Sequence, residues 1–144
     1  MSRALEDLAS DVAAKARRLL ALAAEAGAPL IITQTLRTDE EQEGLYAKGR
    51  TRPGPRVTKA RGGQSWHNPM GLTGQARAFD VTFRTPEGGI SWKGPWATIG
   101  TLGESVGLAW GGRWPTFPDR PHFEDRGGRT LAAWRAEYRP TALA

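Results

Sequence analysis

The sequence predicts an α+β domain in which helices flank a small antiparallel sheet. Segments with helical periodicity and segments with β-branched or alternating residues follow in the order helix, strand, helix, strand, helix, strand, strand, helix. This order does not alternate as a doubly wound fold would. The length of 144 residues suits one domain with a hydrophobic core of its own. We find no internal repeat, and therefore expect residues 1–144 to form a single domain.

The first part of the chain is predicted to contain a helix, a strand and a second helix. Apolar residues recur at three- and four-residue steps over about residues 4–26, and Gly27 stands where a glycine commonly follows a helix. Residues 30–35 are rich in β-branched side chains and predict a strand. A capping box that begins at Thr38 predicts a helix over about residues 39–48.

The second part is predicted to contain three strands and two helices. Residues 78–83 alternate between apolar and other side chains, which is typical of a strand. Residues 95–106 begin with proline and stop before glycine, as helices often do. Residues 108–110 and 122–124 predict short strands on either side of a Gly/Pro-rich loop, and about residues 130–138 predict a last helix.

Positive charge is concentrated in one segment. The chain has 20 Lys and Arg against 15 Asp and Glu, a net charge of +5. Residues 50–64 contain five basic residues and no acid, namely Arg50, Arg52, Arg56, Lys59 and Arg61. This basic loop (residues 50–64) is suited to contact nucleic acid, an anionic polymer or an acidic substrate, although a solvated loop is the commoner explanation of such a run. Cysteine is absent, which excludes disulfides, cysteine zinc fingers and thiol nucleophiles.

The beginning of the chain does not resemble a secretion signal. Charged residues are spread through residues 1–26, and no uncharged run is long enough for a signal-peptide core or a membrane span. We therefore expect a protein without a signal peptide, made in the cytoplasm and without stable membrane insertion.

Two histidines and one aspartate are the best candidates for a metal site. His67 and His122 are the two histidines of the chain, and Asp80 lies inside an apolar strand, where an unpaired carboxylate is costly. Two imidazoles and one carboxylate form a catalytic zinc site with one open position. Asp119, three residues before His122, could act as general base. The residues alone leave a structural role for the histidines open, as well as an Asp80–Arg ion pair.

The motifs around these residues resemble those of a known peptidase family. They are Ser65-x-His67, a segment that ends in Ala78-x-Asp80, and Asp119-x-x-His122-Phe123-Glu124. They resemble peptidase family M15, the zinc D-alanyl-D-alanine carboxypeptidases and L-alanyl-D-glutamate endopeptidases that cut the peptide part of peptidoglycan. Residues 33–38, with Glu41-Gln42 and Leu45-Tyr46, are similar to the family's upstream strand–helix block. The resemblance covers about residues 30–125 and implies an M15 peptidase-like, or hedgehog-like, fold around a zinc site.

The resemblance implies a role for seven residues. The zinc ligands would be His67, Asp80 and His122, and Asp119 would be the catalytic acid and base. Three residues would contact the substrate or its surroundings: Arg37 would stabilise the substrate carbonyl and its oxyanion, and Ser65 and Trp66 would lie in the substrate-binding region. The residues alone favour a surface ion pair for Arg37, a turn for Ser65 and a place in the core for Trp66.

One stretch departs from the family pattern. His67 and Asp80 lie 13 residues apart, whereas the family pattern brings its first histidine and aspartate closer together. We therefore expect residues 68–75 to form an enlarged loop beside the site, in contact with substrate.

The sequence thus predicts a single zinc-dependent catalytic domain that cleaves bacterial peptidoglycan. The L-alanyl-D-glutamate bond is the expected target, because that branch tends to have Asp where the carboxypeptidase branch has Glu, and this chain has Asp119. A compact basic chain also resembles a phage endolysin, a bacteriolytic enzyme that gathers as a monomer in the host cytoplasm and reaches the cell wall after release. The alternatives are a D-alanyl-D-alanine carboxypeptidase, a metal-bound domain without catalysis, and a basic nucleic-acid-binding module. We expect no nucleic-acid partner, because a nucleic-acid-binding role would leave the His/Asp motifs unexplained.

Overall fold

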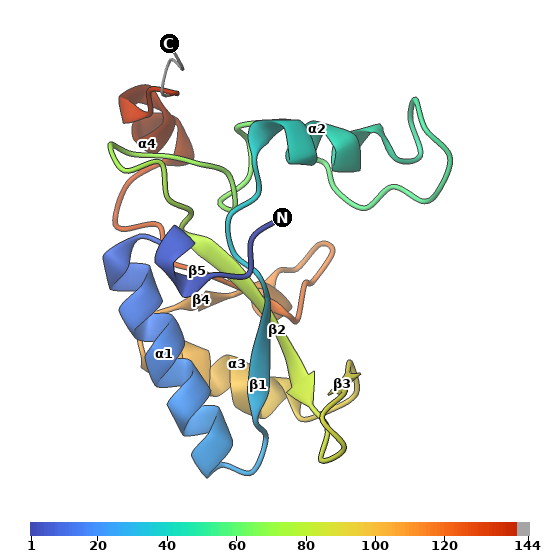
Figure 1. Cartoon of the computed structure of the whole chain (residues 1–144), viewed down its shortest axis with the longest axis vertical. Coiled ribbons are helices and arrows are strands. Elements are labelled where there is room, and N and C mark those ends of the chain that lie inside the picture. The colour runs from blue at the N-terminus through green and yellow to red at the C-terminus, as the bar shows by residue number, and fades with distance from the viewer. Residues whose placement is uncertain (141–144) are drawn as a thin grey trace.

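Five strands form one antiparallel sheet in the computed structural model, which describes residues 1–140 (Figure 1). The strand order is β1 (Leu30–Gln34), β2 (Ala78–Arg84), β5 (His122–Glu124) and β4 (Ala109–Trp110), and β3 (Ile90–Ser91) pairs with β2. Helices flank this sheet, so the predicted α+β class is confirmed. The two-residue strand β3 was not predicted, because so short a segment carries no periodicity.

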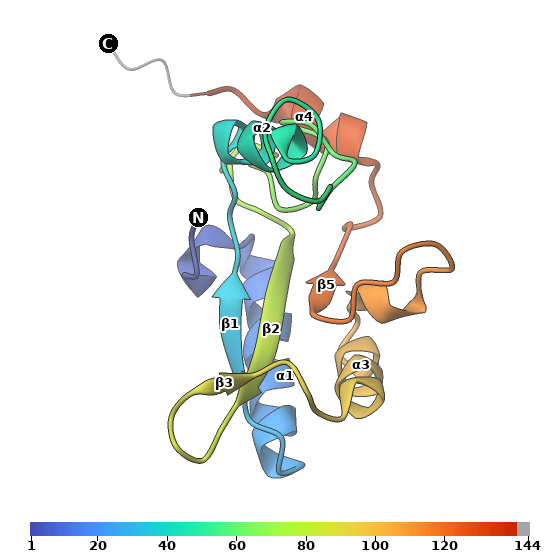
Figure 2. The ribbon, with the colours of Figure 1, turned by 90° about the vertical axis from the view of Figure 1, so that its right-hand side faces the viewer.

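Two helices cover one face of the sheet and two lie beyond one of its ends (Figures 1 and 2). The first pair is α1 (Ser10–Glu25) and α3 (Trp96–Ser105), which contact each other and share the hydrophobic core. The second pair is α2 (Asp39–Ala47) and α4 (Leu131–Glu137), which are joined by an Arg135–Asp39 ion pair. No helix within residues 1–140 is long and apolar enough to cross a membrane.

The N-terminal helix begins later than the sequence predicts. The predicted helix over about residues 4–26 is divided into a 3₁₀ turn at Leu5–Asp7 and the α-helix α1. Leu8 is extended between them, and the Ala9 N–H donates to the Ala76 carbonyl at 2.9 Å. A contact with a distant segment therefore replaces one helical turn. The helix ends as predicted, with Gly27 at a φ of 80°.

Alternation along β2 separates the core from the opposite face. Phe79, Val81 and Phe83 belong to the core cluster, and the Phe79 ring stacks on Phe123 of β5 with 5.7 Å between ring centres. Because successive side chains point to opposite faces of a strand, Asp80 lies on the face away from α1 and α3. The core therefore fixes the strand that presents this carboxylate.

Two glycines let α3 approach the sheet closely. A Cβ atom on Gly103 would lie 2.3 Å from a ring carbon of Phe123, and one on Gly100 would lie 2.3 Å from the Trp110 ring. Both rings are buried in the core, so they have little room to move.

We expect Gly103→Ala to lower the free energy of unfolding by about 1–3 kcal/mol, because the added methyl group overpacks the core against Phe123. Gly44→Ala is the matched control: Gly44 lies within α2 with open space around its Cβ position, so this change should raise stability by about 0.5–1 kcal/mol. Urea unfolding followed by tryptophan fluorescence measures both, and equal stability of the two variants would contradict the close packing of α3.

Candidate metal centre and active site

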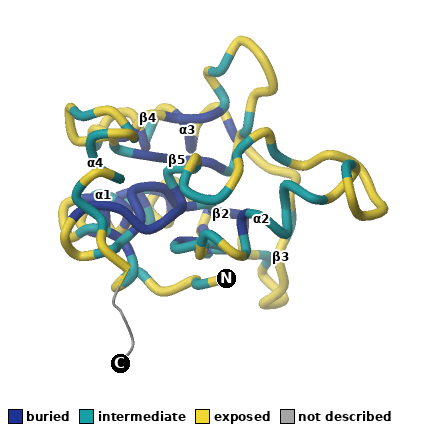
Figure 3. The backbone as a smooth tube through the Cα atoms, turned by 90° about the horizontal axis from the view of Figure 1, so that it is seen from above, coloured by how far each residue is buried: buried dark blue, intermediate teal, exposed yellow. Residues whose placement is uncertain are grey.

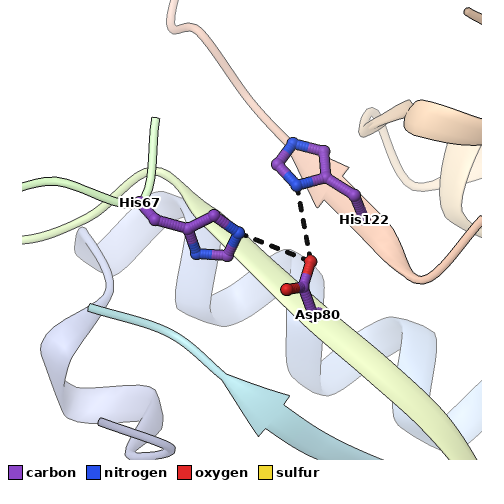
Figure 4. Close-up of side chains that lie close together, drawn as sticks. All are labelled: His67, Asp80 and His122. Atoms are coloured by element: carbon purple, nitrogen blue, oxygen red, sulfur yellow. Dashed lines mark ion pairs between the residues drawn. The ribbon is translucent and has the colours of Figure 1, made fainter. Parts of the chain in front are cut away.

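Three candidate metal ligands meet although they come from distant parts of the chain (Figure 4). Asp80 on β2 is directly opposite His122 on β5 in the strand register, so the sheet brings these two side chains together. His67 comes from the loop before β2, and its backbone carbonyl accepts a hydrogen bond from the Arg37 N–H at 2.8 Å. One ligand atom from each of the three residues lies within 4.8 Å of the others.

Two of the three distances between these atoms match those between ligands of a tetrahedral metal ion. Asp80 Oδ1 lies 3.4 Å from His67 Nε2 and 3.4 Å from His122 Nδ1. Two ligands bound to zinc at tetrahedral angles are separated by roughly 3.3–3.5 Å. Asp80 Oδ1 is also buried without a hydrogen-bond partner among residues 1–140. A buried carboxylate oxygen that faces two imidazole nitrogens in this way fits a bound cation.

Hydrogen bonds on the far side of each imidazole determine which nitrogen faces Asp80. His67 Nδ1 lies 2.8 Å from the Thr35 carbonyl, which can only accept, so this nitrogen carries the proton and Nε2 keeps its lone pair. His122 Nε2 lies 2.7 Å from Glu124 Oε1 and donates to that carboxylate, which leaves Nδ1 as the free donor atom. The tautomers assigned from these partners give both rings a lone pair toward Asp80.

Glu124 belongs to the motif around His122, but the sequence did not predict its contacts. Its side chain is buried, and its second oxygen accepts a hydrogen bond from Arg126 Nε at 2.5 Å. It therefore joins His122 to Arg126 and holds the imidazole in place. The signal that could have shown this is its position two residues after His122 on a strand, which places both side chains on one face.

The carboxylates and imidazoles perturb one another's pKa values. Burial acts to raise the pKa of Asp80, but His67 and His122 outweigh it and hold that pKa well below its usual range. Burial acts to lower the pKa of His122, but Asp80 and Glu124 raise it to about 9. Burial opposes ionisation of Glu124 as well, and His122 and Arg126 still lower its pKa. Positive charge is therefore strongly favoured between these two carboxylates.

The structure brings all seven predicted site residues to one hollow of about 520 Å³. They are Arg37, Ser65, Trp66, His67, Asp80, Asp119 and His122. Residues of two loops line this hollow, the basic loop after α2 and the loop before β5, and both loops project on the same side of the molecule (Figure 1).

Asp119 differs from the other carboxylates of this hollow. Its side chain makes no hydrogen bond or ion pair within residues 1–140, and burial raises its pKa, with His122, His67 and Arg37 opposing that effect. Backbone hydrogen bonds fix its position: the Asp119 N–H donates to the Gly111 carbonyl at 2.9 Å. A Cβ atom on Gly111 would lie 2.4 Å from the Asp119 carbonyl oxygen, so this approach requires glycine. Asp119 is thus a fixed carboxylate that can gain or lose a proton.

Arg37 is held by a buried polar network that sequence reasoning missed. Its guanidinium donates to Gln42 Oε1 at 2.7 Å and to Gln34 Oε1, and its Nε is buried without a partner among the described residues. Asn68, fully buried, donates to the Arg37 carbonyl at 3.0 Å and accepts from the backbone N–H of Ser65. Gln42 lies in α2 and Asn68 in the loop before β2, and no residue near either one in the sequence indicates that its side chain is buried.

Ser65 and Trp66 border the hollow in different ways. Ser65 Oγ accepts a hydrogen bond from the His67 N–H at 3.1 Å, so it shapes the turn that carries the histidine. The Trp66 ring is partly exposed to the hollow, and the Arg126 guanidinium lies 5.2 Å from its centre. Trp66 is therefore available to contact a ligand, and Ser65 positions His67.

The enlarged loop does not lie where the sequence predicted. None of residues 68–75 lines the hollow that contains His67. The loop packs against α4 instead, where the Gly71 N–H donates to the Trp134 carbonyl at 3.0 Å and Gly74 approaches the Tyr138 ring. The extra length of residues 68–75 thus docks the C-terminal helix, and their contact with substrate stays a prediction.

The five charges of the basic loop do not form one surface, although the loop is exposed along most of its length (Figure 3). Arg50 donates to the backbone carbonyls of Tyr46 and Thr58, and Arg61 pairs with Glu43. Arg50, Arg56 and Lys59 line a hollow next to the one that contains His67, whereas Arg52 lines another beside α2.

Comparisons with known proteins agree with this geometry. Residues 58–125 match a family model described as D-alanyl-D-alanine carboxypeptidase. The chain is 38% identical over 128 residues to the peptidoglycan L-alanyl-D-glutamate endopeptidase CwlK of Bacillus subtilis (strain 168), a match that covers 82% of this chain and 73% of that protein. It is also similar to the crystal structure of the Serratia marcescens L-Ala D-Glu endopeptidase ChiX, with a TM-score of 0.54, 25% identity, and coverage of 83% of this chain and 81% of that one.

Proposed function

The chain belongs to peptidase family M15, and from that premise we propose that it is a zinc-dependent peptidoglycan endopeptidase that cleaves the L-alanyl-D-glutamate bond of the stem peptide. One observation supports the proposal above the others: His67, Asp80 and His122 direct three electron-pair donors to one point, in the same hollow as the carboxylate of Asp119. This is the donor set of a catalytic zinc site that leaves one position open.

His67, Asp80 and His122 would hold the metal ion. When bound, zinc supplies Lewis-acid chemistry, since it polarises a carbonyl group and lowers the pKa of a water molecule toward ~7. The Thr35 carbonyl and Glu124 keep the two imidazoles oriented, and such outer partners commonly change metal affinity by about 10–100-fold. Glu124 is therefore a positioning residue, and its two partners leave it poorly suited to act as a base.

Asp119 would act as general base and then as general acid. Burial raises its pKa, which brings it closer to the pH at which a carboxylate exchanges protons efficiently. It would accept the proton of the attacking water and return it to the leaving amine. Arg37 lines the same hollow and would stabilise the oxyanion that forms on the scissile carbonyl. Trp66 would contact the substrate, and Ser65 would hold the turn beside it.

The endopeptidase assignment rests on two supports. The similar proteins from B. subtilis and S. marcescens are both named L-alanyl-D-glutamate endopeptidases. The chain also has Asp119 where the resemblance assigns Glu to the carboxypeptidase branch. A D-alanyl-D-alanine carboxypeptidase is the second candidate, because the matching family model carries that description.

We further propose that the enzyme works as an endolysin: a bacteriolytic protein, of phage origin, that acts as a monomer on the wall after release from the host cytoplasm. All proposed site residues come from one chain, so no partner subunit is needed to complete the site. The net charge of +5 favours contact with an anionic wall. A nucleic-acid-binding role has no comparable support, since it leaves the cluster of His67, Asp80 and His122 unexplained.

Mass spectrometry of purified peptidoglycan after digestion tests the function directly. We expect new L-alanine carboxyl ends and D-glutamate amino ends, and no products after treatment with a chelator. Release of terminal D-alanine instead would identify the carboxypeptidase, and digestion that a chelator leaves unchanged would contradict zinc dependence.

We expect the purified protein to bind about one zinc ion per chain, and His122→Ala to lose tight binding because one of three ligands is removed. Zinc content after dialysis, measured by elemental analysis, is the readout. His122→Ala should also remain folded by circular dichroism, because its strand neighbour Phe123 supplies the core contact. Stoichiometric zinc in that variant would show that the ligand assignment is wrong.

Asp119→Asn should keep its zinc and its fold but lose about 10²–10⁴-fold in turnover, because an amide cannot accept the water proton. Wild-type activity should fall as the pH drops through the raised pKa of Asp119, since protonation removes the base. Turnover measured against pH checks both expectations. A variant with near-normal rates and an unchanged acid limb would assign the base to another group.

A further inference from the structure

A second hollow of about 750 Å³ continues from the candidate active site along the two projecting loops. It shares five lining residues with the hollow that contains His67: Val57, Thr58, Lys59, Trp114 and Asp119. We call this second hollow the side groove. The basic loop forms one of its walls, and the other is formed by Trp114, Thr116, Phe117 and Pro118. The two hollows therefore meet along the five shared residues, and Asp119 is the carboxylate among them.

The side groove carries an excess of positive charge. Arg50, Arg56 and Lys59 line it, and none of them forms an ion pair with a carboxylate within residues 1–140. Arg50 is fixed by its stacking on Tyr46 and by two backbone carbonyls. Arg56 and Lys59 are exposed and make no contact that neutralises them. Asp119 is the one acidic residue among the described residues of the lining, and it stands at the end shared with the active site.

Phe117 lies in the wall opposite the basic loop, and its backbone has an unusual conformation. Its ring is 72% exposed, and its φ of 54° lies in the left-handed region, which bulky side chains rarely adopt. The Lys59 Nζ lies 4.5 Å from the centre of this ring, so the two walls meet there through a cation–π contact. An exposed aromatic ring held in an unfavourable backbone conformation beside an active site is typical of a ligand-binding position.

The chemistry of cleavage indicates which part of the substrate occupies the groove; this step rests on the function proposed above. The acid that protonates the leaving nitrogen must lie within hydrogen-bond reach of it. The fragment that departs with the new amino group therefore lies against Asp119, and the side groove begins there. That fragment starts with D-glutamate. A glutamyl residue linked through one carboxyl group keeps the other one free, so the departing fragment carries a carboxylate next to the cleaved bond.

We propose that the side groove is the binding site for the carboxylate-bearing fragment on the leaving side of the scissile bond. Lys59 and Arg56 bind the free carboxylate of the D-glutamyl residue, and Phe117 supports the following part of the peptide chain. The enzyme therefore distinguishes a free D-glutamyl carboxylate from its amide.

The test uses two soluble stem-peptide fragments that differ in one group, a free D-glutamyl carboxylate in one and a carboxamide in the other. Wild-type zinc enzyme should prefer the acid by about tenfold in kcat/KM, mainly through KM, because a charge-assisted hydrogen bond is lost with the amide. The double variant Lys59→Gln, Arg56→Gln should cleave the two fragments equally well. Arg52→Gln is the control: it removes one positive charge from the same loop but outside the groove, and should keep the preference.

The outcomes separate this proposal from the function on which it rests. Wild-type cleavage of both fragments at equal rates would contradict the proposal that the side groove binds the D-glutamyl carboxylate, and it would leave the endopeptidase assignment intact. A preference that survives in the double variant, or that Arg52→Gln also removes, would likewise contradict that proposal. Weaker binding to whole wall with an unchanged acid-to-amide ratio would assign the cations to an anionic wall polymer instead. Cleavage of neither fragment would overturn the proposed function itself.

Phe117→Gly offers an independent readout. It removes the ring and relieves the positive φ, so it should raise the thermal midpoint of unfolding while it raises KM for both fragments. A purely structural ring would give a change in stability without a change in KM, and that result would contradict the proposed role of Phe117.

Discussion

The arrangement of the site depends on three electron-pair donors that cannot turn away from one another. His67 Nε2 and His122 Nδ1 both face Asp80 Oδ1 at 3.4 Å. Each ring is held from behind, His67 by the Thr35 carbonyl and His122 by Glu124. Burial of such a cluster is costly unless a positive charge lies among the donors. The surrounding hydrogen bonds therefore orient both imidazole lone pairs toward Asp80, an arrangement that would favour a cation.

The sheet supplies the rigidity that this arrangement needs. Asp80 and His122 are opposite each other in the register of β2 and β5, and their strand neighbours Phe79 and Phe123 stack on the core side. Because a slip of β5 by one residue would turn His122 toward the core and away from Asp80, the packing of the two phenylalanines also fixes the candidate metal site. His67 lacks such support from the sheet, and backbone hydrogen bonds with residues 35–37 replace it.

The sequence was informative where local rules act and uninformative where distant segments meet. The capping box at Thr38 and the alternation of β2 were predicted correctly, since each depends on neighbouring residues. The N-terminal helix was predicted too long, because its first turn gives way to backbone pairing between Leu8 and Ala76. The seven candidate site residues were recognised from motifs and line one hollow. The buried amides of Gln42 and Asn68 were missed, since a polar side chain in a sequence gives no sign of the partners that bury it.

Two carboxylates near His122 show how environment divides chemical roles between similar groups. Glu124 accepts hydrogen bonds from His122 and Arg126, and these partners lower its pKa, so its charge is fixed and it serves to orient the imidazole. Asp119 has no such partner within the described chain, and burial raises its pKa, so its proton can move. Pairs of carboxylates whose pKa values are driven apart are typical of acid–base catalysis.

The position of Asp119 at the junction of the two hollows then has a second consequence. In the proposed mechanism Asp119 returns a proton to the leaving amine, and it also lines the groove proposed for the departing fragment, so this mechanism couples proton transfer and recognition of that fragment at one side chain.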